Sequence, residues 1–205
     1  MSIEQHDLHG NAPDTADVAV LLIDVINDLE FDGGEVLLTQ ALPMADQLAQ
    51  LKRRAKQVGI PVIYVNDNFG RWQSDFAKLL AHCLDDGVRG QPLAARLPPE
   101  PEDYFVLKPK HSGFYSTTLA LLLRALQVHT LLLTGLTGDI CVLFTANDAY
   151  MRDFHLVVPA DCVASQDPEE NRHALLHMQR VLKADIRPST ALNLKALTHQ
   201  SGAKR

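Results

Sequence analysis

A cysteine that follows an apolar run is the residue of this chain best placed for chemistry. Residues 130–134 have the composition of a buried strand, and a turn beginning at Gly135 leads to Cys141, where the next helix is expected to start. The thiolate is the reactive form of cysteine, and a helix N-terminus favours negative charge. Cys141 is therefore a candidate nucleophile, although free cysteines are more often buried and inert.

Two other apolar runs end in charged residues. The run at 18–23 is followed by Asp24, and the run at 104–107 is followed by Lys108. Taken singly, these residues are consistent with a turn aspartate and a surface lysine. The carboxyl ends of parallel strands meet at one edge of a sheet, where α/β proteins form their sites. An Asp, a Lys and a Cys at three strand ends therefore indicate one site.

The sequence around these residues resembles the isochorismatase-like cysteine hydrolases, a superfamily that includes nicotinamidases and N-carbamoylsarcosine amidases. The resemblance runs from about residue 16 to about residue 182 and is carried by three segments. These are Leu22-Ile23-Asp24, Val106-Leu107-Lys108-Pro109-Lys110 and Thr134-Gly135-Leu136-Thr137-Gly138-Asp139-Ile140-Cys141. The resemblance implies a triad of Asp24, Lys108 and Cys141, and a non-proline cis peptide between Leu136 and Thr137.

The chemistry expected of such a triad is hydrolysis through a thioester. Asp24 would accept the thiol proton of Cys141, and Lys108 would hold Asp24 and stabilise the thiolate. Backbone N–H groups of Thr137 and Cys141 would stabilise the oxyanion. We therefore expect a small-molecule substrate with a C–N bond, such as an amide, ureido or carbamoyl compound.

The segment after the second apolar run departs from the nicotinamidase pattern. Residues 64–72 contain no histidine, so we expect neither a catalytic metal nor another cofactor. Asn66, Asn68, Trp72 and Phe114 are candidate substrate contacts, with turn or core positions as the plainer interpretation. His173 and His177, four residues apart, fit an ordinary helix face better than a metal pair.

Two alternatives to the amidohydrolase remain open at this stage. One is a vinyl-ether or ester hydrolase with the same fold, although the vinyl-ether-cleaving relatives lack the nucleophilic cysteine. The other is a redox sensor in which Cys141 is oxidised rather than acylated. Asp24 and Lys108 favour catalysis, because a sensor thiol needs no proton acceptor.

Composition narrows the class of protein. The chain has 205 residues, of which 46% are hydrophobic and 21% charged, with a net charge of −6. An acidic chain has no general electrostatic reason to bind nucleic acid or an anionic membrane. Cys83, Cys141 and Cys162 are too few for a disulfide scaffold, so Cys83 and Cys162 are interpreted as structural. With no signal peptide at the N-terminus, the expected compartment is the cytoplasm.

Alternating apolar runs and amphipathic segments predict the fold. We expect an α/β protein with one three-layer α/β/α domain at 16–190 and a mostly parallel six-stranded sheet, whose last strand lies at 184–186. Residues 1–15 are expected to form a flexible arm and residues 191–205 a polar tail. The resemblance and the apolar surface of two predicted helices imply a homodimer or homotetramer.

Overall fold

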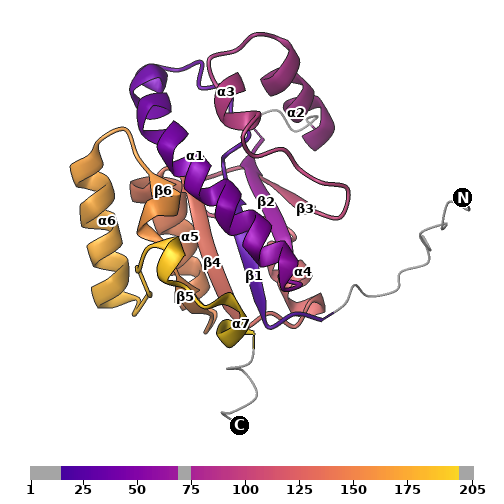
Figure 1. Ribbon diagram of the computed structural model, residues 1–205, viewed down its shortest axis with the longest axis vertical. Helices are drawn as coiled ribbons and strands as arrows, with labels where there is room; N and C mark the ends of the chain where they lie inside the picture. The colour runs from indigo at the N-terminus through magenta and orange to yellow at the C-terminus, as the bar shows by residue number, and fades with distance from the viewer. Residues whose placement is uncertain (1–14, 69–74, 199–205) are drawn as a thin grey trace, which may run out of the picture.

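The structure is a parallel β-sheet covered by helices on both faces (Figure 1). It is a computed structural model that describes residues 15–68 and 75–198. Runs rich in Val, Leu and Ile form the buried strands, as expected for a parallel sheet covered on both sides. The strands are β1 (Val18–Ile23), β2 (Val62–Asp67), β3 (Tyr104–Lys108), β4 (Thr130–Leu136), β5 (His155–Val157) and β6 (Val163–Ala164).

The strand order places four strand ends side by side. The order is β3-β2-β1-β4-β5, and every pairing is parallel. β4 pairs with β5 along its first residues and with β6 at its end, from Gly135 to Leu136. The chain leaves β1 towards one face of the sheet and leaves β4 towards the other. The carboxyl ends of β1 and β4 therefore form a topological switch point, where such folds bind ligands.

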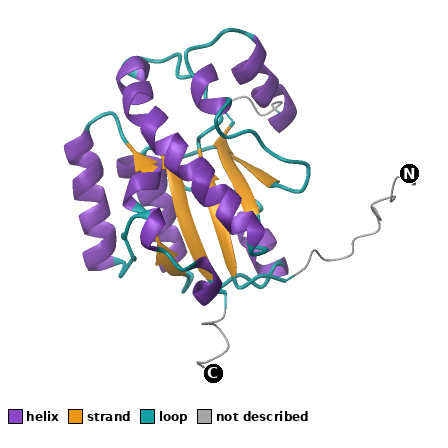
Figure 2. Cartoon of the chain, in the orientation of Figure 1, coloured by secondary structure: helices purple, strands orange, loops and turns teal. Residues whose placement is uncertain are grey.

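Successive side chains of each strand point to opposite faces of the sheet, which divides the hydrophobic core into two parts. On β1, Val18, Val20 and Leu22 pack towards α1, while the residues between them pack towards the opposite helical layer. Both layers are visible in Figure 2. The helices are α1 (Gly34–Gln57), α2 (Phe76–Asp85), α3 (Gln91–Ala94), α4 (Leu119–Ala125), α5 (Leu143–Tyr150), α6 (Pro168–Val181) and α7 (Leu194–Leu197). The first face is covered by α1, α2, α3 and α7, and the second by α4, α5 and α6.

The prediction of a strand at 184–186 is wrong. Asp185 forms a single bridge with Val157, and the sixth strand is β6. The two residues of β6 are too few to show a strand period in the sequence. Within the described residues, no helix is long and apolar enough to cross a membrane.

The packed part of the chain extends past residue 190. Leu192 and Leu194 are buried in the core, and α7 follows them. The Arg54 guanidinium donates hydrogen bonds to the carbonyls of Ser189 and Leu192, at 2.9 and 2.7 Å. The polar tail predicted to begin at 191 is therefore corrected: residues up to 198 belong to the folded domain.

Candidate active site

Three reactive side chains meet at the carboxyl edge of the sheet. Asp24 follows β1, Lys108 ends β3, and Cys141 lies five residues after β4. Lys108 Nζ is 2.8 Å from Asp24 Oδ2 and 3.6 Å from Cys141 Sγ, and the Asp24 carboxyl group interacts with the Cys141 thiol closely enough to raise its pKa. The predicted convergence of the three side chains is confirmed. Their part in catalysis remains a prediction.

The backbone holds Asp24 in an uncommon conformation. Its φ of 52° lies in the left-handed region, which non-glycine residues adopt at an energetic cost. The Asp24 N–H donates to the Val65 carbonyl at 2.9 Å, and Asp24 Oδ1 accepts from the Asp67 N–H at 2.7 Å. Strand β2 therefore fixes both the main chain and the carboxyl group of Asp24.

Cys141 lies in a π-helical turn, η1 (Gly138–Val142), that precedes α5. The peptide bond between Leu136 and Thr137 is cis, as the family resemblance implied. Segments distant in sequence hold this turn, because the Asp139 N–H donates to Ser165 Oγ at 3.2 Å and Ser165 Oγ donates to Asp139 Oδ1 at 2.7 Å. A Cβ atom on Gly138 would overlap the side chains of Asn171 and Val163, so a larger residue would displace them.

Burial is the largest influence on the acidity of Cys141. Burial and the Asp24 carboxylate raise the pKa of the Cys141 thiol to about 12, and the nearby Lys108 only partly opposes them. The thiol is therefore neutral at rest and needs a proton acceptor before it can react. Loss of water around a half-buried sulfur outweighs the partial charge of a helix end.

The other two groups are also shifted by burial and by one another. Burial raises the pKa of the Asp24 carboxyl above its usual range, although Lys108 acts to lower it. For Lys108, burial is the largest single influence and disfavours the charged form, but Asp24, Cys141 and Asp67 together outweigh it, so the pKa of Lys108 is raised. Lys108 is accordingly an ammonium beside a carboxyl group whose affinity for a proton is increased.

A comparison with Cys83 separates acidity from geometry. Burial raises the pKa of the Cys83 thiol to about 12 as well. Cys83 is a fully buried residue of α2, whereas Cys141 is partly accessible and lies close to both a carboxyl group and an ammonium. What distinguishes Cys141 is therefore an adjacent proton acceptor and access to solvent, not an acidic thiol.

Two predicted substrate contacts have other positions. Asn66 is fully buried, and its Nδ2 donates to the Ile26 carbonyl at 2.7 Å, so it supports the loop after Asp24. Phe114 is 6% exposed and packs between Phe154 and the Arg152 guanidinium. Neither residue is placed to contact a ligand, because both side chains are enclosed by the protein.

The remaining predicted site residues are Asn68, Trp72 and Thr137. Asn68 is buried, and its N–H donates to the Lys108 carbonyl at 3.0 Å, which continues the β2–β3 ladder. Trp72 lies outside the described residues. Thr137 begins the Cys141 turn, and its Oγ1 is buried without a hydrogen-bond partner in the described part of the chain. The oxyanion-stabilising role of the Thr137 and Cys141 N–H groups remains a prediction.

Sequence reasoning passed over Asp67, which the structure adds to the site. Asp67 ends β2, between the strands that carry Asp24 and Lys108, and its Oδ2 is 3.6 Å from Lys108 Nζ. The sequence contains a signal for Asp67, because this carboxylate lies at the end of an apolar run, as Asp24 does. The asparagines on either side of Asp67 favour a turn, which obscures this signal in the sequence.

The donor set at this edge does not fit a metal ion. Among residues 15–68 and 75–198, no group of three or more His, Cys, Asp and Glu side chains is arranged to hold one. Asp67, the carboxylate at the end of β2, faces the Lys108 ammonium instead.

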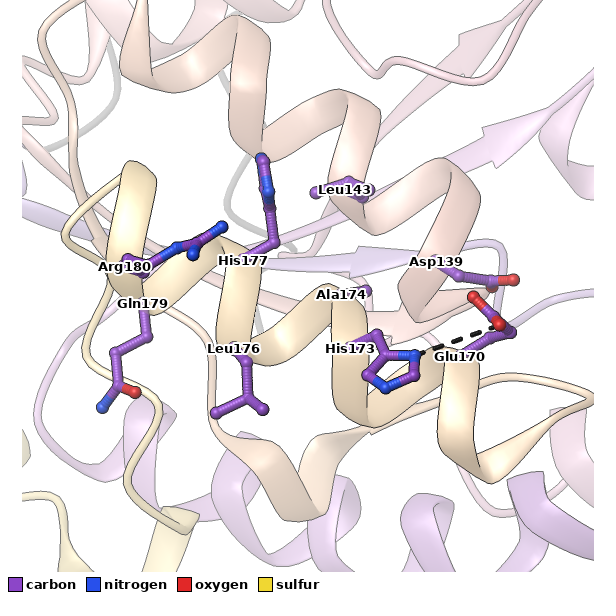
Figure 3. Close-up of a pocket in the computed structure, with 9 residues that line it drawn as sticks. All are labelled: Asp139, Leu143, Glu170, His173, Ala174, Leu176, His177, Gln179 and Arg180. Carbon is purple, nitrogen blue, oxygen red and sulfur yellow. Dashed lines mark ion pairs between the residues drawn. The ribbon is translucent and has the colours of Figure 1, made fainter.

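A wide surface hollow of about 720 Å³ lies to one side of this centre, between α6 and the start of α5 (Figure 3). His173 and His177 line it from α6, and His173 Nδ1 is 4.0 Å from Glu170 Oε1. Asp24, Lys108 and Cys141 do not line this hollow. The two histidines lie on the surface of a helix, in agreement with their interpretation as helix-face residues.

Comparison with known proteins gives the family. The model of the isochorismatase domain matches residues 18–186, which includes all four strand ends described above. The chain belongs to the isochorismatase family. This family and its structural neighbours consist of hydrolases, so the chain is an isochorismatase-family hydrolase.

Relatives of this isochorismatase-family hydrolase include proteins named as amidohydrolases. The uncharacterized isochorismatase family protein YaaI of Bacillus subtilis is 44% identical over 171 residues, which cover 83% of this chain and 93% of YaaI. Ureidoacrylate amidohydrolase RutB of Methylorubrum extorquens is 28% identical, over 75% of this chain and 72% of RutB. The crystal structure of N-carbamoylsarcosine amidase from Thermoplasma acidophilum has a TM-score of 0.67 and 28% identity, covering 86% of this chain and 99% of the amidase.

Proposed function

We propose that this protein is a cysteine-dependent hydrolase that cleaves the C–N bond of a small amide, ureido or carbamoyl compound through a thioester. The observation that carries the proposal is the position of Lys108 Nζ, within 2.8 Å of Asp24 Oδ2 and 3.6 Å of Cys141 Sγ. A nucleophile, a proton acceptor and a cation in mutual contact form the arrangement that covalent hydrolysis requires.

The reaction begins with the neutral thiol. As Cys141 Sγ attacks the carbonyl carbon, its proton passes to the Asp24 carboxylate, and the carbonyl oxygen becomes an oxyanion. Asp24 then returns the proton to the leaving nitrogen as the C–N bond breaks, which leaves an acyl-thioester and a free amine. The raised pKa of Asp24 suits this exchange, because it brings the acidity of the carboxyl group closer to the working pH.

A water molecule completes the cycle. Asp24, again a carboxylate, removes a proton from the water molecule while the water oxygen attacks the thioester carbonyl. The C–S bond breaks, and Asp24 returns that proton to the sulfur. One water is consumed, and the products are a carboxylic or carbamic acid and an amine or ammonia. Lys108 stays protonated throughout and balances the negative charge that moves between Asp24 and Cys141.

The state of the thiol argues against the redox-sensor alternative. Sensor cysteines are exposed thiols of low pKa, because the thiolate is the form that peroxides oxidise. Burial and Asp24 raise the pKa of the Cys141 thiol to about 12. A thiol of this kind reacts only when a substrate and a proton acceptor are both in place, which favours hydrolysis.

The decisive experiment combines a hydrolysis screen with mass spectrometry of the intact protein. Primary amides, ureides and carbamoyl acids are offered to the wild type, to Cys141→Ser and to Cys83→Ala. The wild type and Cys83→Ala should hydrolyse the same compound and gain an acyl mass on Cys141. Cys141→Ser should lose at least about a thousandfold in kcat, with a change in unfolding free energy below about 2 kcal/mol. Near-normal turnover by Cys141→Ser would refute the covalent mechanism.

A further inference from the structure

Asp67 is a charged group of the site to which the reaction above gives no task. It ends β2, lies opposite Lys108 in the β2–β3 register, and has its Oδ2 3.6 Å from Lys108 Nζ. Its side chain is 33% exposed, whereas those of Asp24 and Lys108 are 7% and 0% exposed. Of these three charged groups, Asp67 is the one most accessible to a ligand arriving from solvent.

The chemistry of a carboxylate defines what Asp67 can recognise. An ionised carboxylate only accepts hydrogen bonds, and its two oxygens offer about four acceptor positions. It can therefore contact Lys108, keep other partners and accept from a ligand at the same time. The complementary ligand group is an N–H donor, such as the NH₂ of a carbamoyl, ureido or primary amide group.

The distances place that donor next to the scissile carbonyl. Cys141 Sγ and Asp67 Oδ2 each lie 3.6 Å from the same Lys108 Nζ, so the two atoms are at most about 7 Å apart. An attack distance of about 3.3 Å, a C–N bond of about 1.3 Å and an N–H···O distance of about 2.9 Å span a similar length. A carbamoyl group attacked by Cys141 can therefore reach Asp67 with its own nitrogen.

We propose that Asp67 is a specificity-determining residue that accepts a hydrogen bond from the N–H group attached to the carbonyl under attack. The preferred substrate class is then one with an NH₂ on that carbonyl, as in carbamoyl, ureido and primary amide groups. Compounds that carry a methyl group in its place are disfavoured. This inference rests on the proposed function, because it requires Cys141 to attack that carbonyl.

Two esters that differ in a single group test the proposal. p-Nitrophenyl carbamate and p-nitrophenyl acetate release the same leaving group, but the first carries NH₂ on the carbonyl where the second carries CH₃. Asp67→Asn keeps the volume and removes the charge, Asp67→Ser provides a second variant, and Asp46→Asn on the surface of α1 is the control. Initial rates of p-nitrophenol release give kcat/KM for each ester, and urea denaturation confirms that each variant is folded.

The expected result is a selective loss. Asp67→Asn and Asp67→Ser should lower kcat/KM for the carbamate by about 10- to 100-fold, as for the loss of a hydrogen bond to a charged acceptor. The acetate shares any loss caused by the changed contact with Lys108, so its kcat/KM should fall at least about tenfold less than that of the carbamate. The control Asp46→Asn should affect neither ester. An equal loss on both esters would overturn the role of Asp67 while leaving the thioester mechanism intact. If neither ester acylates Cys141 in the wild type, the proposed function itself is wrong and the inference fails with it.

Discussion

Replacing Lys108 with methionine removes the ammonium between Asp24 and Cys141 and keeps a side chain of similar length. Lys108 Nζ lies 2.8 Å from Asp24 Oδ2, and the Lys108 side chain is 0% exposed. At an effective dielectric constant of about 20, unit charges at this distance attract each other by about 6 kcal/mol. The variant no longer desolvates an ammonium, which offsets part of that loss. Breaking a buried pair then destabilises a protein by about 3–5 kcal/mol.

The loss of stability in Lys108→Met should depend on pH, and the burial of Asp24 decides whether it grows or shrinks as pH rises. Without Lys108, burial is the dominant influence on Asp24, so the pKa of that carboxyl rises further above its unfolded value. A carboxyl group whose pKa is higher in the folded state binds more protons when folded. Stability therefore falls as pH rises from the unfolded to the folded pKa, by about 1.4 kcal/mol per pH unit. The destabilisation caused by Lys108→Met should therefore be smallest at about pH 5 and should increase towards pH 8.

Urea denaturation at several pH values measures this effect. The wild type, Lys108→Met and the double variant Asp24→Asn/Lys108→Met are compared. Equal m-values for the three proteins check that each unfolds in a two-state transition. The double variant has no charge at either position, so it should recover much of the stability at pH 8 while remaining inactive. Equal losses for Lys108→Met at pH 5 and pH 8 would refute the reasoning. So would a double variant that is no more stable than Lys108→Met at pH 8.

Three further predictions concern the turn, metal dependence and assembly. Gly138→Ala should cost about 1–3 kcal/mol of stability and at least tenfold in kcat, because its Cβ overlaps Asn171, and adding Asn171→Ala should recover part of both. A chelator should leave hydrolysis of the identified substrate unchanged, and loss of activity restored by a stoichiometric divalent ion would contradict this. Sedimentation equilibrium should detect a homodimer or homotetramer. Phe144→Asp and Leu176→Asp, at exposed apolar positions of α5 and α6, should weaken it. A wild-type monomer at all concentrations would contradict this prediction.

The sequence alone determined the elements that carry the chemistry. Apolar runs at 18–23, 104–107 and 130–134 predicted three of the strands. β1 and β4 are buried throughout, and a parallel strand covered on both faces consists almost wholly of hydrophobic residues. The strand ends then identified Asp24, Lys108 and the turn to Cys141, since topology brings the carboxyl ends of parallel strands to one edge. These features are local in sequence, and composition and order are sufficient to find them.

Only the tertiary structure decided how these groups behave and which neighbours join them. The acidity of the Cys141 thiol depends on its burial and on its distance from Asp24, and neither quantity is contained in a local pattern. Asn66 and Phe114 carried groups suited to a ligand, yet the packing of other segments enclosed them. Asp67 became part of the site because β2 lies between β1 and β3, which sets its carboxylate beside Lys108. Desolvation and charge interactions are set by atoms that are distant in sequence and close in space, so they are defined only once the chain has folded.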